Sequence, residues 1–136
     1  MAFWRLNERS SGIAEIAGLI LNMPKHDASG DAVDWGDMIY LQDSKTTITC
    51  DNGRRLRVYG SPYSPIYGNW AFQYPRSENV WSEKIPDDID ILITHGPLRA
   101  HLDLLKMGCV HLSKELWRVR LRLHVFGHVH EGAGTE

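Results

Sequence analysis

Two short apolar runs, each ending near a histidine and a glycine, constrain the fold of this chain more than any other feature. The first run spans residues 90–94 and is followed by His95; the second spans residues 123–126 and is followed by Gly127 and His128. Short apolar runs bounded by glycine and proline are typical of buried strands. Because open α/β sheets place their sites beyond the carboxyl ends of their strands, both histidine groups are candidate site residues.

The second run carries two histidines that are separated by one residue. In an extended segment, residues two apart point to the same side, so His128 and His130 are expected to aim at one point beyond the strand end. Neutral imidazole is a common ligand of borderline transition metals, and His95 supplies a third such ring. Spacing alone leaves two interpretations open, a metal site and an ordinary strand–loop junction whose histidines bind nothing.

A family resemblance favours the metal site. Residues 93–97, Ile-Thr-His-Gly-Pro, together with residues 127–132, Gly-His-Val-His-Glu-Gly, resemble the last two metal-binding motifs of the calcineurin-like metallophosphoesterases. Three further segments resemble the branch related to the brain-type metallophosphoesterase-domain proteins, which has many fungal members: 59–65, 69–72 and 85–86.

The resemblance also implies a fold. It predicts an α/β chain that forms the C-terminal part of a metallophosphoesterase-type α/β/β/α sandwich with mixed sheets, truncated at both ends. The partial metallophosphoesterase domain is expected to span residues 38–136. Residues 1–37 are expected to form an N-terminal helix and loop whose relationship to that domain the sequence leaves open.

Local patterns predict individual elements within this frame. An apolar face over 13–21 indicates an amphipathic helix, and leucine spacing predicts two more helices over 98–105 and 112–119. Asp51-Asn52-Gly53 separates two β-prone runs and predicts a hairpin, because Asn and Gly tolerate the positive φ of a tight turn. Arginines at 118, 120 and 122 alternate with apolar residues, which indicates one solvated and one buried face. The aromatic stretch over 61–81 is interpreted as a loop anchored by packing, with a wall for a nucleotide base as the alternative.

The resemblance implies a chemistry as well. In such enzymes two divalent metals act together on a phosphoester, with His95 and His128 on one metal and His130 on the other. No catalytic residue is predicted beyond these ligands. The expected cofactors are Mn, Fe, Zn or Ni, two in the intact family and one or none here, because imidazole suits these ions better than Ca or Mg. The implied partner is a small phosphomonoester or phosphodiester, with a cyclic nucleotide among the candidates.

Three other motifs of the family are missing from this sequence: Asp-x-His, Gly-Asp at a strand end, and Gly-Asn-His followed by an acid. Gly36-Asp37 and Gly68-Asn69-Trp70 match fragments of these patterns by coincidence. We therefore expect the chain to bind at most one metal weakly and to have little or no hydrolase activity. The alternative is a non-catalytic, truncated interaction or complementation module that self-associates through exposed sheet edges.

Composition excludes several other classes. The chain has 136 residues and a formal net charge of −2, which disfavours general nucleic-acid binding. Cys50 and Cys109 show no metal-binding or disulfide spacing, so reduced intracellular thiols are expected. The longest apolar stretch, residues 13–23, is too short to cross a bilayer. The sequence thus predicts a soluble, cytoplasmic protein without membrane association.

Overall fold

The computed structural model describes residues 19–20, 39–69, 71–104, 106–132 and 134. The described elements, in chain order, are β1 (Leu19–Ile20), β2 (Ile39–Tyr40), β3 (Ser44–Thr49), β4 (Arg55–Ser61), β5 (Ser64–Pro65), β6 (Gln73–Tyr74), β7 (Ile91–Thr94), α1 (Val110–Val119), β8 (Leu123–Val125) and the short 3-10 helix η2 (His130–Gly132).

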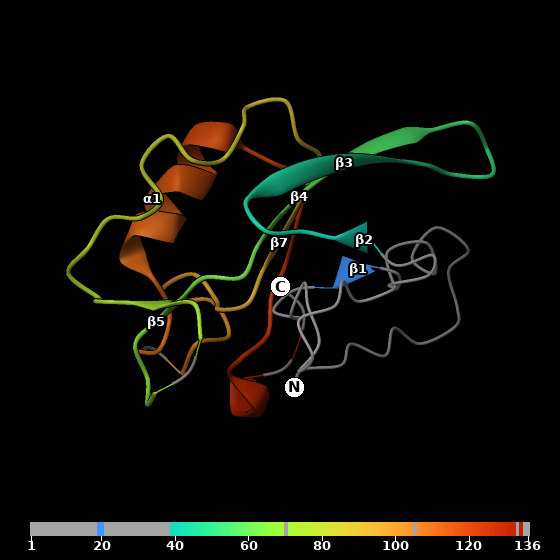
Figure 1. The fold of residues 1–136 in the computed structure, drawn as a ribbon. Coiled ribbons are helices and arrows are strands. Elements are labelled where there is room, and N and C mark those ends of the chain that lie inside the picture. The colour runs from blue at the N-terminus through green and yellow to red at the C-terminus, as the bar shows by residue number, and fades with distance from the viewer. Residues whose placement is uncertain (1–18, 21–38, 70, 105, 133, 135–136) are drawn as a thin grey trace, which may run out of the picture.

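A four-stranded mixed sheet forms the centre of the molecule (Figure 1). Its strand order is β3-β4-β7-β8, with β3 antiparallel to β4 and the other two pairs parallel. Two further parallel pairs, β1–β2 and β5–β6, contain two residues in each strand. The predicted α/β class with mixed sheets is confirmed, and this arrangement is compatible with part of an α/β sandwich.

The hairpin of β3 and β4 forms where the sequence predicts it. Gly53 adopts a φ of 78°, a left-handed conformation that glycine accepts without steric strain, and its N–H donates to the Cys50 carbonyl at 2.8 Å. Arg55 and Arg57 are exposed, whereas Leu56 is half-buried and Val58 is buried. The predicted alternation of solvent-exposed and buried residues along the start of β4 is therefore confirmed.

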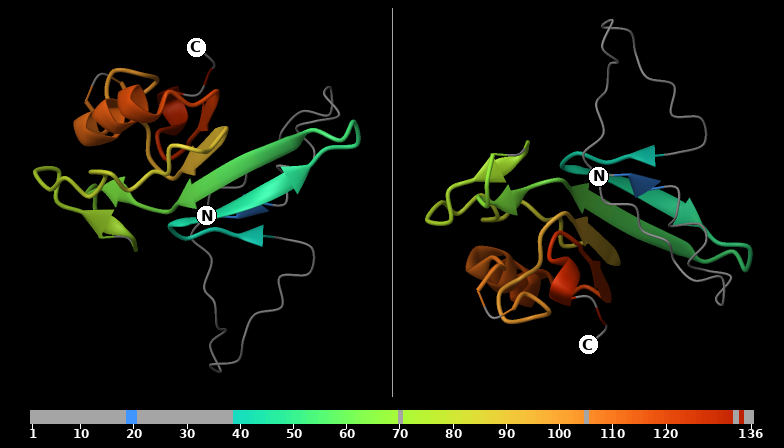
Figure 2. Two further views of the ribbon diagram at one scale, coloured as in Figure 1. Left: turned by 90° about the horizontal axis from the view of Figure 1, so that it is seen from above. Right: turned by 90° about the horizontal axis from the view of Figure 1, so that it is seen from below.

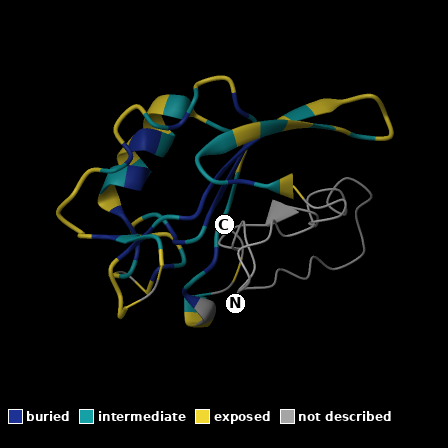
Figure 3. Ribbon diagram, in the orientation of Figure 1, coloured by how far each residue is buried: buried dark blue, intermediate teal, exposed yellow. Residues whose placement is uncertain are grey.

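The sheet has a core on each face. One core contains Tyr59 and Leu92 and packs against α1 through Leu112, while Val58 and Ile91 belong to the opposite core. Figure 2 accordingly shows α1 and the β1–β2 pair on opposite sides of the β3–β4 hairpin. Burial is greatest where β4 and β7 run side by side (Figure 3), and every residue of β7 is buried. A parallel strand covered on both faces is expected to be apolar throughout, as β7 is at three of its four positions.

Helix α1 forms where the leucine pattern over 112–119 predicts a helix. Cys109 caps its start, with Sγ accepting from the Leu112 N–H at 3.4 Å, and Arg120 ends it in a left-handed conformation. The predicted solvated face is confirmed, because Arg118, Arg120 and Arg122 are exposed, whereas Val119 and Leu121 between them are half-buried. No helix among the described residues is long and apolar enough to span a membrane.

Two helix predictions are wrong. Residues 98–105 form a bridge and turns within the described positions, and Ala100, Leu102 and Leu104 have φ values of 69°, 48° and 52°. These left-handed conformations are incompatible with a right-handed helix. In the N-terminal pattern, Leu19–Ile20 is a strand paired with Ile39–Tyr40 and not the end of a helix; the rest of that pattern lies outside the described residues.

The aromatic stretch packs as predicted at its buried members. Tyr74 and Trp81 are 4% and 1% exposed, with their rings edge to face at 6.5 Å. Trp81 Nε1 donates to the Tyr74 hydroxyl at 2.8 Å. Burial raises the pKa of that hydroxyl well above its ordinary value. Packing is therefore the role of this part of the segment.

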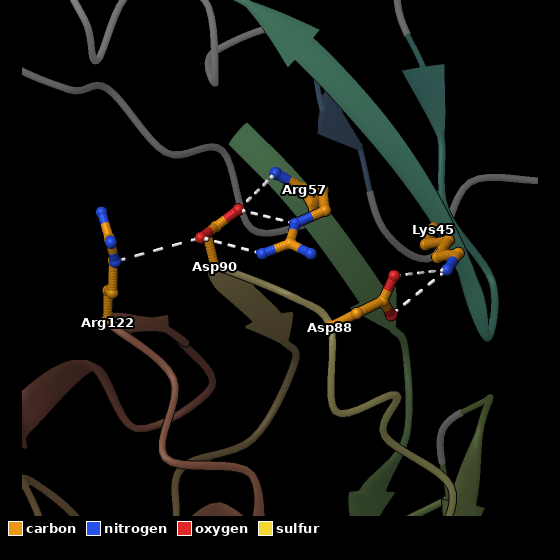
Figure 4. Close-up of polar contacts among 5 residues, drawn as sticks. All are labelled: Lys45, Arg57, Asp88, Asp90 and Arg122. Carbon is orange, nitrogen blue, oxygen red and sulfur yellow. Dashed lines mark hydrogen bonds and ion pairs between the residues drawn. The ribbon is translucent and has the colours of Figure 1, made fainter. Parts of the chain in front are cut away.

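Acidic residues clamp the sheet where β7 begins (Figure 4). The Asp90 carboxylate accepts from the backbone N–H of Arg57 at 2.9 Å and from its Nε at 3.1 Å, and Arg122 lies 3.9 Å away. Asp88 pairs with Lys45 at 3.0 Å on the exposed surface. These carboxylates join neighbouring strands at the start of β7.

Candidate metal centre

The two histidine-bearing loops meet at one edge of the sheet. In the parallel register, Thr94 of β7 lies opposite Ser61 of β4, and Ile93 lies opposite Val125 of β8. The carboxyl ends of three strands therefore coincide. His95 follows β7 directly, and His128 follows β8 after two residues, so both rings reach the same edge, as the sequence predicted.

The two imidazole rings are in direct contact. His128 Nδ1 lies 3.1 Å from His95 Nε2, and the ring centroids are 4.8 Å apart. One nitrogen of this pair must carry a proton and the other a lone pair for the contact to be a hydrogen bond. Both side chains are half-buried, so the pair remains accessible to a small ligand.

This separation suits two ligands of one metal ion. For nitrogens about 2.1 Å from a shared ion, neighbouring ligands lie about 3.0 Å apart in octahedral geometry and about 3.4 Å apart in tetrahedral geometry. The observed 3.1 Å falls between these values. The proton shared by the rings would have to move to an outer nitrogen, because a ligating nitrogen needs its lone pair. The distance between these two nitrogens is therefore compatible with two ligands of one divalent ion.

The backbone around the second histidine differs from the predicted extended segment. His128 has a φ of 72°, and His130 begins the short helix η2. The extended geometry inferred for His128 and His130 is therefore wrong. The His130 side chain lies outside what the structure describes, so its role as a third ligand remains a prediction. Within the described residues, no group of three His, Cys, Asp or Glu side chains is placed to hold a metal.

Backbone and side-chain hydrogen bonds hold the histidine loops together. The Gly127 N–H donates to the His95 carbonyl at 3.0 Å, which ties one loop to the other. Thr94 Oγ1 donates to the Gly96 carbonyl at 2.7 Å and therefore accepts from His124 Nε2 at 2.8 Å. This assignment places the His124 proton on Nε2.

The His124 ring is neutral. Its Nδ1 is buried and has no hydrogen-bond partner among the described residues. Burial, followed by the nearby charge of His101, lowers the pKa of His124 to about 3. His124 therefore supports the loop after β7 as a neutral donor, a role that its sequence position inside a strand did not suggest.

Tyr67 is the further residue that the structure brings to this edge. Its ring is 61% exposed and meets the His128 ring edge to face, with centroids 6.5 Å apart. The sequence grouped Tyr67 with the packing aromatics. The neighbouring Gly68, with a φ of 88°, marks a tight turn and is the local signal that could have separated Tyr67 from that group.

Comparison with known proteins identifies relatives that match most of this chain. No family model matches the chain. The chain is 49% identical over 106 residues to a probable rhamnogalacturonate lyase C of Emericella nidulans, covering 76% of this chain and 10% of that protein. It is 46% identical over 106 residues to human metallophosphoesterase domain-containing protein 1, covering 71% of this chain and 31% of that protein.

A third relative is a UPF0046 protein of Caenorhabditis elegans, 38% identical over 104 residues, with 71% of this chain and 25% of that protein covered. The chain thus spans about a third or less of the length of the curated relatives it matches. Because the match to the probable lyase is confined to a tenth of that protein, its name carries no activity over to this chain. The similarity to the human protein and to the UPF0046 protein, each over 71% of this chain, supports a metallophosphoesterase-like family for this chain.

Proposed function

We propose that this chain supplies His95 and His128 to a divalent metal centre for phosphoester hydrolysis. The contact between His128 Nδ1 and His95 Nε2 at the carboxyl ends of neighbouring parallel strands carries the proposal. Family membership supports it, because the name of the human relative refers to a metallophosphoesterase domain. The substrate class is a small phosphomonoester or phosphodiester.

The residues of this chain provide an incomplete centre. His130 is proposed as a further ligand, while the aspartate and asparagine of the family motifs have no counterpart in the sequence. Two divalent ions a few ångströms apart repel each other strongly unless a carboxylate bridges them. We therefore infer that the chain binds at most one ion weakly and has little or no hydrolase activity. Mn, Fe, Zn or Ni are the expected ions.

The described side chains around the centre act by holding its geometry. Thr94 and His124 fix the turn at Gly96, and the Gly127 N–H fixes the His95 carbonyl. Tyr67 offers an exposed aromatic surface beside His128 for the organic part of a phosphoester. A bound divalent ion would add positive charge that stabilises the phosphoryl oxygens during hydrolysis.

Manganese titration of the purified chain tests this proposal. We expect about one ion per chain, and binding at least tenfold weaker in His95→Ala and in His128→Ala, because each substitution removes one ligand. His111→Ala is the matched control, since it removes a half-buried histidine of α1 instead. Hydrolysis of an aryl phosphodiester, measured in parallel, should stay close to the buffer rate.

Two results would count against this function. Equal manganese affinity in the His128→Ala variant and the unchanged chain would exclude the histidine pair as the site. Tight binding of two ions per chain would contradict an incomplete centre and would show that other residues replace the missing carboxylates.

A second candidate function is a non-catalytic interaction or complementation module. The observation that favours it is the position of β8, which in the described sheet has β7 as its one neighbouring strand and leaves Leu123 46% exposed. A strand with an open side can pair with another chain. In this case the chain would bind a protein partner, or a second copy of itself, without hydrolysing a substrate.

A further inference from the structure

A pocket in the described structure is lined by two arginines and by none of the candidate metal ligands. It has a volume of about 350 Å³ and lies between β5, the loop after β7 and the start of α1. The residues that line it are Pro65, Arg76, Arg99, Gly108, Cys109 and Val110. None of these is a histidine or a carboxylate, so the pocket is chemically distinct from the proposed metal centre.

Two arginines converge on this pocket. Arg99 Nη1 donates to the Lys106 carbonyl at 3.0 Å, and Arg76 Nη1 donates to the same carbonyl at 3.4 Å and to that of Met107 at 3.1 Å. Both guanidinium groups are therefore held close together by one loop. In the part of the chain that the structure describes, neither Arg76 nor Arg99 forms an ion pair with a carboxylate.

Backbone contacts fix the position of this arginine pair. The Arg99 N–H donates to the Cys109 carbonyl at 3.2 Å, and the Cys109 N–H donates to the Pro97 carbonyl at 3.1 Å. Gly108 approaches so closely that a Cβ there would lie 2.2 Å from the Leu98 carbonyl oxygen. The loop that carries Arg99 is thus bound to the start of α1.

The charged side chains that line the pocket are both arginines, although the buried carboxylate of Asp103 accepts from the N–H of the lining residue Gly108 at 2.9 Å. Two neighbouring guanidinium groups repel each other, and the first turn of α1 contains no acidic side chain. The positive end of α1 makes a smaller contribution than the arginine pair to the positive potential at the pocket. Guanidinium groups present planar forks of donors that match phosphate oxygens, and a phosphate dianion offsets both charges at once.

We propose that the pocket formed by Arg76 and Arg99 binds the phosphate group of a small anionic ligand. Its volume is at the lower end of the range for ligand pockets, which suits a phosphate with a small organic group attached. The pocket adjoins the histidine loop, since a Cβ at Gly96 would lie 3.6 Å from Pro65 Cδ. Phosphate binding there needs no metal ion, so this inference stands independently of the proposed hydrolysis.

Inorganic phosphate, titrated into the chain with EDTA present and monitored by amide chemical shifts, tests the proposal. We expect the largest shifts at Arg99, Cys109 and Val110, and a dissociation constant at least tenfold higher in the Arg76→Gln/Arg99→Gln double variant. Arg54→Gln/Arg55→Gln is the matched control, because it also removes two guanidinium charges, both from exposed positions at the start of β4. Its affinity for phosphate should change less than twofold.

Three outcomes would overturn the proposal. The first is unchanged affinity in a folded Arg76→Gln/Arg99→Gln variant. The second is an equal loss of affinity in Arg54→Gln/Arg55→Gln, which would indicate a general charge effect. The third is a set of phosphate-dependent shifts in the unchanged chain that is centred away from the pocket. The third result does not depend on whether the Arg76→Gln/Arg99→Gln variant folds. A chain that binds phosphate here but no manganese at His95 and His128 would separate this pocket from the proposed function.

Discussion

At the scale of single residues, the protonation of His124 links the histidine loops to stability. In the folded state the pKa of His124 is lowered from its ordinary value of 6.5 to about 3. As the pH falls, the unfolded chain therefore binds a proton at His124 before the folded chain does. The contribution of the neutral His124 ring to the free energy of unfolding is therefore fully present above pH 6.5. It is lost progressively as the pH falls toward 3. The free energy of unfolding should fall by about 1.4 kcal/mol per pH unit in this window from His124 alone.

Urea unfolding at several values between pH 7 and pH 4 measures this effect. In His124→Gln the dependence of the unfolding free energy on pH should be shallower than in the unchanged chain by about one proton, because glutamine does not titrate. An identical slope in the two proteins would show that His124 already protonates with an ordinary pKa in the folded state.

The sequence placed His95 and His128 at one sheet edge because two short apolar runs determine where the parallel strands end. It did not give the left-handed conformation of His128, nor the proximity of Tyr67. Both depend on how loops distant in sequence pack against each other. Strand ends can be inferred from local patterns, whereas loop conformations depend on contacts that no local pattern contains.

At the scale of elements, the carboxylate clamp before β7 joins three strands. Arg57, the largest influence on Asp90, holds the pKa of its carboxyl below the ordinary range. Asp90→Ala should lower the free energy of unfolding by about 1–2 kcal/mol at pH 7, since it removes charge-assisted bonds to a backbone N–H and a guanidinium. Asp88→Ala is the control, because its partner Lys45 is 53% exposed and surface pairs contribute little.

Thermal unfolding of both variants, measured at several pH values between 7 and 2, tests the contribution of Asp90 to stability. The difference in stability between Asp90→Ala and the unchanged chain should disappear as the pH falls through the lowered pKa of Asp90. The unchanged chain then loses the same negative charge by protonation. Equal melting temperatures for the two alanine variants would contradict a special role for Asp90.

The elements differ in how well the sequence predicted them. The hairpin and the two apolar strands were predicted because their turn residues and burial patterns are local. The leucines over 98–105 have helical spacing, yet tertiary contacts prevail there. Buried Asp103 accepts from the Gly108 N–H at 2.9 Å, and such side-chain bonds compete with helical backbone pairing.

At the scale of the whole molecule, the side of β8 that has no partner among the described strands predicts self-association. Sedimentation equilibrium over a range of concentrations should show a mass above that of one chain, and Leu123→Lys should restore the monomer, because a charge on an edge strand opposes pairing. Trp117→Lys is the control, since Trp117 is 78% exposed but lies on α1. A monomer at every concentration in the unchanged chain would exclude edge pairing.

The strand order β3-β4-β7-β8 repeats the order of these strands along the chain. During synthesis on the ribosome, each strand can therefore join the edge of what has already formed. The β3–β4 hairpin closes over a short loop and pairs first, whereas β7 and β8 join across longer connections and pair more slowly. We therefore expect His95 to meet His128 only after β8 has docked, as the last of these four strands to pair.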